Sequence, residues 1–230
     1  MTKKEQIQKM FNDISRRYDF LNHFLSLGID FSWRRKLVNQ LSYYHPECIL
    51  DVATGTGDLA LLISGLKPEL ITGIDIAGDM LAIARQKAII KHLQDRLTFQ
   101  EGDAEALPFP EESFDAVTVA FGVRNFENLE KGLSEMKRVM RTGGVMMILE
   151  FSHPESFPWR QLYWIYAKYI IPFIGKMVSR NQQAYSYLPA SVSGFPSGED
   201  FINILVNARM KKVTRQKLTF GIATIYTGVK

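Results

Sequence analysis

The chain has 230 residues, of which 46% are hydrophobic and 23% are charged, so it can bury one sizeable core. Its net charge of +4 is modest and comes without a block of basic residues, and we therefore expect no nucleic-acid partner. The first residues are charged, and no run of about eighteen apolar residues occurs without a charge. Composition thus predicts neither secretion nor a membrane span, and favours a cytoplasmic location.

Two kinds of periodicity follow one another along the chain. Residues 1–45 are helical in pattern, with Ile7, Met10, Phe11 and Ile14 at helical spacing before an aromatic-rich stretch that ends at Trp33. From residue 46 to 153, short apolar runs alternate with amphipathic segments of helix length. The order strand, helix, strand, helix, strand is typical of a parallel, doubly wound sheet. Segments 113–122 and 144–152 supply a fourth and a fifth strand, and we expect the helix over 128–140 to be broken by glycines 143 and 144.

The C-terminal third departs from this alternation. Residues 154–198 form an aromatic, proline-containing insertion, after which 199–208 predict a helix and 210–229 predict two strands around Gly221. We therefore expect one α/β domain over residues 1–230. Its parts are a helical lead-in over 1–45, a ligand-binding core over 46–153, the insertion over 154–198, and a helix with a terminal hairpin over 199–230.

A glycine loop follows the first predicted strand in the segment DVATGTGD, residues 51–58. Gly55 and Gly57 let the backbone approach a ligand closely, because no Cβ blocks it and positive φ costs them little. Asp75 ends the second strand about twenty residues beyond the loop, where a carboxylate can accept both hydroxyls of an adenosine ribose. The loop and Asp75 together predict a site for an adenosine-containing cofactor.

Two cofactor classes compete for this loop, because GTGDLA, residues 55–60, also satisfies the dinucleotide fingerprint. Asp58 opens the following helix, where its carboxylate would repel a pyrophosphate but tolerate the ammonium group of an amino acid. A helix cap is the alternative role for Asp58. Asp103 follows the third strand and is placed to accept the exocyclic amine of adenine, while Ala104 packs against the ring. These positions favour S-adenosylmethionine.

A nicotinamide-dependent oxidoreductase remains an alternative function. A short-chain dehydrogenase would need a Tyr-x-x-x-Lys pair in mid-chain, and the chain has only Tyr226 with Lys230. A non-catalytic protein that binds S-adenosylmethionine or a prenyl quinone is a second alternative. Turnover to S-adenosylhomocysteine would separate a binding protein from an enzyme.

Three segments give the chain a specific resemblance. They run from Tyr18 to Trp33, from Asp103 to Asn125, and from Arg138 to Ser152. In these segments the chain resembles the quinone-biosynthesis C-methyltransferases, and the match runs nearly from end to end. The resemblance implies a class I, Rossmann-like methyltransferase with a seven-stranded, mostly parallel sheet, a terminal antiparallel hairpin and helices on both faces.

The resemblance also implies a set of site residues. The predicted cofactor contacts are Gly55, Thr56, Gly57, Asp75, Asp103, Ala104 and Ala120, with no metal ion. The family usually carries Met, His, Ser and Arg at four positions where this chain has Leu21, Asp30, Ala120 and Ser193. We therefore expect a cofactor contact at position 120 to come from the backbone.

The implied reaction is C-methylation of a 2-polyprenyl demethylnaphthoquinol to menaquinol, with the ubiquinone-type benzoquinol as a related substrate. The acceptor carbon must be electron-rich, so a cation should stabilise negative charge on the adjacent oxygen. Arg124 is the candidate for that cation, with Asn125 as its hydrogen-bond partner; a structural ion pair is the alternative role for Arg124.

Two further segments are assigned to the substrate side. Tyr18 and Asn22 lie in the lead-in, which we expect to close as a lid or to pack on the sheet. Residues 159–174, which include Trp164, are unusually aromatic and suit contact with a prenyl tail or with the inner face of the membrane. Ordinary core packing is the alternative for this segment.

Overall fold

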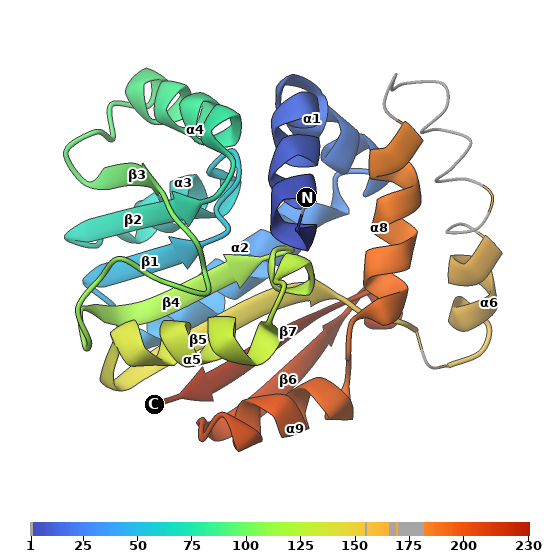
Figure 1. Ribbon diagram of the computed structural model, residues 1–230. Coiled ribbons are helices and arrows are strands. Elements are labelled where there is room, and N and C mark those ends of the chain that lie inside the picture. The colour runs from blue at the N-terminus through green and yellow to red at the C-terminus, as the bar shows by residue number, and fades with distance from the viewer. Residues whose placement is uncertain (1, 155, 166–168, 170–181) are drawn as a thin grey trace.

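The computed structural model describes residues 2–154, 156–165, 169 and 182–230. These residues contain a seven-stranded sheet with the order β3-β2-β1-β4-β5-β7-β6 (Figure 1). Its strands are β1 (Cys48–Val52), β2 (Leu70–Asp75), β3 (Leu97–Glu101), β4 (Phe114–Ala120), β5 (Met140–Phe151), β6 (Lys211–Leu218) and β7 (Ala223–Val229). Neighbouring strands are parallel except at β7, which is antiparallel to both β5 and β6. The predicted mostly parallel sheet with a terminal antiparallel hairpin is confirmed.

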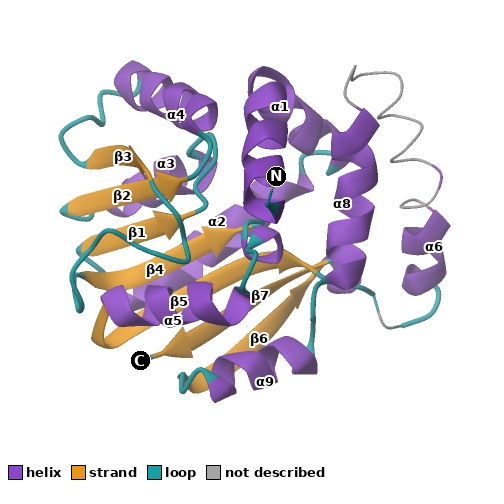
Figure 2. Ribbon diagram, in the orientation of Figure 1, coloured by secondary structure: helices purple, strands orange, loops and turns teal. Residues whose placement is uncertain are grey.

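Helices cover both faces of the sheet, because successive strand residues point to opposite sides. Ile49 of β1 belongs to a core cluster with α2 (Ile29–Leu41), α3 (Asp58–Ile63) and α4 (Gly78–Ile90). Leu50, the next residue, belongs to a second cluster with α5 (Leu129–Val139) and α9 (Glu199–Asn207). Figure 2 shows α5 and α9 in front of the sheet and α2 and α3 behind it. The predicted helices over 128–140 and 199–208 are therefore present with slightly shorter bounds.

Helix α1 (Lys3–Leu25) lies across the carboxyl ends of the strands, next to α8 (Gln182–Gly194) (Figure 1). It begins where Thr2 and Glu5 form a reciprocal capping box, which satisfies two amide groups of the first turn. Helix α6 (Trp159–Ile165) lies on the outer side of α8. No helix of the described part of the chain is long and apolar enough to cross a membrane.

Short 3₁₀ turns complete the connections, as η1 (Ser42–Tyr44), η2 (Ser64–Leu66), η3 (Val123–Asn125) and η5 (Thr219–Gly221). The expectation that glycines 143 and 144 break the helix before β5 is wrong. Helix α5 already ends at Val139, and β5 begins at Met140, whose buried side chain pairs opposite Phe114. Gly143, with φ of 82°, lies inside the irregular first half of β5, where the register with β4 shifts.

Candidate active site

The glycine loop lies between β1 and α3, at the point where the strand order reverses between β1 and β4. Gly55 and Gly57 both have positive φ, and Gly57 directly precedes α3. A Cβ atom on Gly57 would lie 2.9 Å from the ring of Phe99, so this glycine lets the loop pack closely against β3. Gly55 lines a cavity instead. The loop therefore presents Gly55 toward a ligand while Gly57 fixes its position.

Asp75 ends β2 and holds this loop in place. Its Oδ2 accepts the N–H of Gly55 at 2.8 Å, and its Oδ1 accepts the N–H of Ala77 at 2.9 Å. Burial raises the pKa of the Asp75 carboxyl, although these backbone donors oppose that rise. The carboxylate thus lies beside the loop and lines the same cavity as Gly55.

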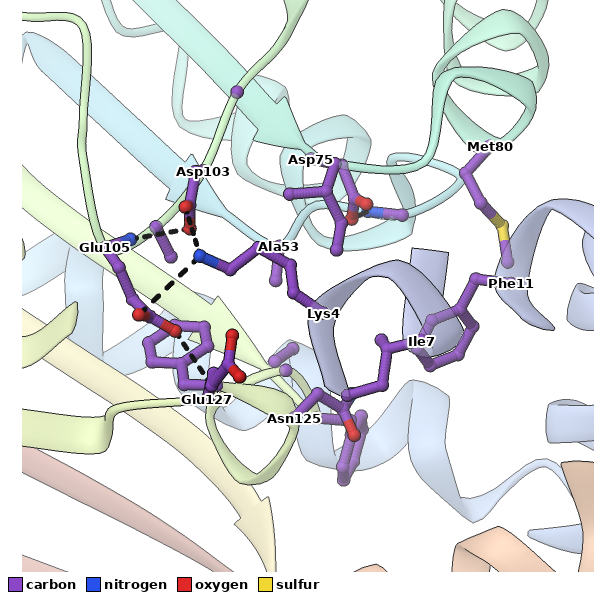
Figure 3. A pocket seen from close by; sticks show the side chains of 18 of the residues that line it. Lys4, Ile7, Phe11, Ala53, Asp75, Met80, Asp103, Glu105, Asn125 and Glu127 are labelled. Atoms are coloured by element: carbon purple, nitrogen blue, oxygen red, sulfur yellow. Dashed lines mark hydrogen bonds and ion pairs between the residues drawn. The ribbon is translucent and has the colours of Figure 1, made fainter. Parts of the chain in front are cut away.

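Asp103, just beyond β3, also lines this cavity. Its Oδ1 accepts the N–H of Glu105 at 2.9 Å, and its Oδ2 accepts a hydrogen bond from the ammonium group of Lys4 on α1. Figure 3 shows Lys4 reaching across to Asp103 and to Glu105, whose Oε2 is 3.6 Å from Nζ. The hydrogen bond to Asp103, more than any other contact, raises the pKa of Lys4. Sequence reasoning did not single out Lys4, because nothing in its local pattern distinguishes it from a solvated lysine.

The cavity brings together most of the predicted site residues. Its walls include five predicted cofactor contacts and two predicted substrate-side or catalytic residues: Gly55, Asp75, Asp103, Ala104, Ala120, Tyr18 and Asn125. Ile7 and Phe11 of α1 and Met80 of α4 form an apolar wall. The cavity is thus lined by small residues of the glycine loop and acidic residues at the strand ends, and α1 covers it.

A second, smaller cavity adjoins the first and shares Tyr18, Ala53, Gly55 and Ala120 with it. Most of its remaining lining residues carry a charge or a hydroxyl, and Arg34, Asp51, Thr56 and Asp58 are among them. This cavity therefore offers both a cation and carboxylates beside the glycine loop.

Asp51 is the most perturbed carboxyl group of this second cavity. It is buried, and its two oxygens accept the hydroxyls of Thr54 at 2.6 Å and Thr118 at 2.7 Å. Burial outweighs these bonds and raises the pKa of Asp51 to about 6. The sequence placed Asp51 in the loop motif but did not identify it as a site residue.

Asp58 begins α3, as predicted, but its charge is compensated. Its carboxylate lies 2.6 Å from Lys87 Nζ and 3.4 Å from His23 Nε2. The repulsion that Asp58 alone would exert on a pyrophosphate is therefore weakened, and the choice of cofactor class depends more on Asp103 and the second cavity.

Thr56 is almost fully buried, and its hydroxyl donates to Asp19 of α1, whose other oxygen lies 2.7 Å from Lys87 Nζ. Asn22, one turn later on α1, bonds the hydroxyl of Tyr18. Trp164 lies on α6 with an exposed side chain. Part of the predicted tail-binding segment, residues 166–168 and 170–174, lies outside the described residues.

Arg124 lies in η3 and is buried against β5 and α8. Its Nη1 forms a 2.8 Å ion pair with Glu150, which is fully buried, and its Nε lies 3.3 Å from Ser191 Oγ. Nη1 also donates to the carbonyl of Phe121. The structural ion pair considered above is thus present.

A hydrogen bond connects η3 to α8, since the Tyr187 hydroxyl donates to Asn125 Oδ1 at 2.9 Å. Burial raises the pKa values of Tyr187 and Tyr18, although the charge of Arg124 lowers both. Both phenols are therefore hydrogen-bond donors at neutral pH. Tyr187 was not predicted as a site residue, because only the packing of α8 brings it to η3.

The tyrosine that a dehydrogenase would require is unsuited to catalysis. Tyr226 is fully buried in β7, and its hydroxyl oxygen accepts the N–H of Gly198 at 2.8 Å. Tyr226 belongs to the core cluster that contains Phe201, on the face of the sheet opposite to α4.

The sheet order, the glycine loop and the carboxylates after β2 and β3 together define a class I methyltransferase that uses S-adenosylmethionine. The family model of the ubiE/COQ5 methyltransferase family matches residues 1–230. The chain belongs to this family.

Curated relatives match over nearly the whole chain. A demethylmenaquinone methyltransferase of Bacteroides fragilis is 48% identical over 229 residues, covering 99% of this chain and 94% of that one. The Thermus thermophilus enzyme of the same name is 46% identical and covers 95% and 99%. A ubiquinone/menaquinone biosynthesis C-methyltransferase of Geotalea daltonii is 45% identical and covers 99% and 97%.

Solved structures support the fold. A SAM-dependent methyltransferase from Thermotoga maritima, 18% identical, superposes with a TM-score of 0.63 and covers all of both chains. A phosphoethanolamine N-methyltransferase of Haemonchus contortus, 15% identical, gives a TM-score of 0.62 over 85% of this chain and 52% of that one.

Proposed function

We propose that the protein transfers a methyl group from S-adenosylmethionine to a ring carbon of a 2-polyprenyl demethylnaphthoquinol, producing menaquinol. Membership of the ubiE/COQ5 methyltransferase family supports C-methylation in menaquinone or ubiquinone biosynthesis. The demethylmenaquinone methyltransferases at 48% and 46% identity favour the naphthoquinol over the benzoquinol. The observation that carries the proposal is the pair of carboxylates, Asp75 and Asp103, that line one cavity with Gly55.

The residues around the cavities fit S-adenosylmethionine. Asp75 would accept the ribose hydroxyls, and Asp103 would accept the exocyclic amine of adenine, with Ala104 against the ring. Asp51 and Arg34 of the second cavity complement the ammonium and carboxylate groups of the methionyl moiety. The cofactor supplies an activated methyl group on a sulfonium, and the protein aligns donor and acceptor while excluding water.

The acceptor side is assigned to the junction of α1, η3 and α8. Arg124 would stabilise negative charge on the oxygen next to the reacting carbon, because its buried side chain places a positive charge at this junction. The Tyr18 hydroxyl and the amide N–H groups of Asn125 would donate hydrogen bonds to the quinol oxygens, and Tyr187, which donates its proton to Asn125, would orient that amide. Glu150 holds Arg124 in place and is a positioning residue.

Residues 1–45 act as a lid in this proposal, because Lys4, Ile7, Phe11 and Tyr18 all line the cavity from α1. The insertion over 154–198 is assigned to the prenyl tail and to peripheral contact with the membrane. Trp164 is exposed on α6, as such a contact requires. Replacing Trp164 with Ser should lower activity on long-tailed quinols and leave activity on a short-tailed analogue unchanged.

The decisive experiment is an assay of the purified protein with S-adenosylmethionine and either a demethylnaphthoquinol or a ubiquinone-type benzoquinol. We expect S-adenosylhomocysteine and C-methylated product with the naphthoquinol. Cofactor binding without turnover on either quinol would identify a binding protein instead. Faster turnover of the benzoquinol would reverse the substrate preference while leaving the reaction class intact.

A further inference from the structure

An exposed apolar surface lies where α1 ends and α2 begins. Five large apolar side chains face water there, and we call them the apolar turn: Phe20, Phe24, Leu27, Ile29 and Phe31. Leu27 is 79% exposed and Phe20 is 60% exposed. Isolated exposed apolar residues are ordinary, but a group of five within twelve residues indicates an interaction surface.

Two ring contacts and an unusual backbone angle shape the apolar turn. The rings of Phe20 and Phe24 stack with centroids 5.8 Å apart, and the ring of Phe31 stacks on His23 at 4.1 Å. Leu27 at the tip has a φ of 52°, in the left-handed region that leucine rarely adopts. The contact between His23 and Phe31 therefore joins the end of α1 to the start of α2.

The turn is also rigid, because Asp30 is buried beneath it. Ser26 donates to Asp30 at 2.6 Å, His23 Nδ1 lies 2.8 Å from the same carboxylate, and Arg34 pairs with it. Burial opposes the shift, but the hydroxyl of Ser26 and the charge of Arg34 together keep the pKa of Asp30 below its usual value, so this carboxylate is ionised at neutral pH. The hydrogen bonds and ion pair of buried Asp30 thus fix the backbone of the turn whose apolar side chains face water.

The charges beside the patch select the kind of partner. Asp30 is the single acidic residue between positions 20 and 46, and it is buried and paired. Arg35 and Lys36 of α2 are exposed. Arg35 and Lys36 thus place positive charge beside the apolar turn, and the neighbouring carboxylates of Asp19 and Asp58 are both paired with Lys87, so this surface complements anionic lipid.

The helix that leads into the apolar turn also lines the catalytic cavity, and α2 contacts a segment that stacks on α6. Tyr18, two residues before Phe20 on α1, lines both cavities. On the other side, Trp33 of α2 donates to Thr219 at 2.8 Å, and the adjacent Phe220 stacks on Trp159 of α6 at 3.7 Å. Lipid binding at this turn would therefore act on the same helix that lines the cavity.

We infer that the apolar turn is a membrane-docking surface, which inserts Phe20, Phe24 and Leu27 among the headgroups of an anionic bilayer while Arg35 and Lys36 bind lipid phosphates. The inference rests on the proposed function, because a polyprenyl quinol resides in the bilayer and its ring must reach the cavity past α1. The bilayer is a source of substrate in this arrangement.

Vesicle co-sedimentation of the full chain tests the inference. Phosphatidylglycerol-containing vesicles should bind the wild-type protein, and phosphatidylcholine vesicles should bind it less. The double variant Phe20→Ser/Leu27→Ser should lose binding by about fivefold or more, because the inserted side chains supply most of the affinity. Ile89→Ser/Ile90→Ser is the matched control, because these α4 residues are 54% and 77% exposed and lie away from the turn. The control variant should bind like the wild type.

Arg35→Gln/Lys36→Gln provides a second test that leaves the apolar residues intact. It should remove the preference for phosphatidylglycerol, and it involves two exposed side chains, so folding should not change. Equal binding by all variants, or no binding by the wild type, would overturn the inference. A wild-type dimer in lipid-free light scattering that disappears in Phe20→Ser/Leu27→Ser, without vesicle binding, would assign the patch to a second copy instead.

Turnover on a short-tailed, water-soluble quinol separates this inference from the proposed function. The Phe20→Ser/Leu27→Ser variant should keep that turnover while losing vesicle binding. If the wild type does not methylate the soluble quinol, the proposed function fails whatever the vesicles show. If it does so but ignores vesicles, only the docking surface fails.

Discussion

Lys4 of α1 donates a hydrogen bond to Asp103, a carboxylate that lies 99 positions away in the sequence and lines the main cavity. The Lys4 ammonium group therefore occupies the Asp103 carboxylate, which we propose as the acceptor for the exocyclic amine of adenine. The closed position of the first turn of α1 and the binding of adenine therefore compete for one carboxylate.

This competition predicts that Lys4→Gln raises cofactor affinity. The ion pair is partly exposed, so its loss should lower the dissociation constant of S-adenosylhomocysteine by up to about fivefold. Lys3→Gln is the matched control, because Lys3 bonds the carbonyl of Phe126 and not Asp103. Isothermal titration of both variants would measure the difference. Weaker binding by Lys4→Gln would mean that Lys4 helps to hold the cofactor.

Asp103→Asn should weaken cofactor binding by roughly ten- to a hundredfold, because it removes a charge-assisted acceptor. Asp75→Asn should weaken binding similarly and should also lower the melting temperature. The N–H groups of Gly55 and Ala77 each donate to one oxygen of Asp75. In the Asn variant, the NH₂ group would face one of these N–H donors, which would lose its acceptor. Unchanged affinity in both variants would contradict the assignment of the cofactor site.

Cofactor binding should depend on pH through Asp51. Burial raises the pKa of this carboxyl to about 6, so it is ionised above pH 6 and neutral below it. A neutral Asp51 cannot attract the ammonium of the methionyl moiety, and affinity should therefore fall between pH 7 and pH 5, by at most about tenfold per unit for one proton. The Asp51→Asn variant should show a flat profile over this range. A wild-type profile as flat as that of Asp51→Asn would exclude Asp51 as the ammonium partner.

Arg124→Lys should lower kcat by about tenfold or more while cofactor affinity stays unchanged, because a lysine cannot pair with Glu150 and also present a second donor. Lysine is preferable to alanine here. Arg124→Ala would leave Glu150 buried without its partner, at a cost of about 3–5 kcal/mol in stability. Melting temperature, dissociation constant and kcat should be measured together. Parallel losses in all three would make Arg124 purely structural.

The elements that the sequence predicted well are those with local patterns. Alternating apolar runs and amphipathic helices revealed β1 to β5, and Asp75 and Asp103 were predicted because parallel strands bring their carboxyl ends together. Lys4 and Tyr187 were missed because long-range packing brings them to the site. Tyr187 bonds a residue 62 positions away, and no periodicity encodes that contact. The end of α5 was misplaced because the buried side chain of Met140 favours strand pairing before the glycines are reached.

Among the strands that the structure describes, β6 pairs with β7 alone, and β7 lies between β6 and β5. Residues 211–218 therefore have no strand to pair with until residues 223–229 have paired with the edge of β5. A chain truncated between positions 218 and 223 would leave that edge open to other unfolded chains. A nonsense mutation that late in the gene would thus cost the sheet two strands at once.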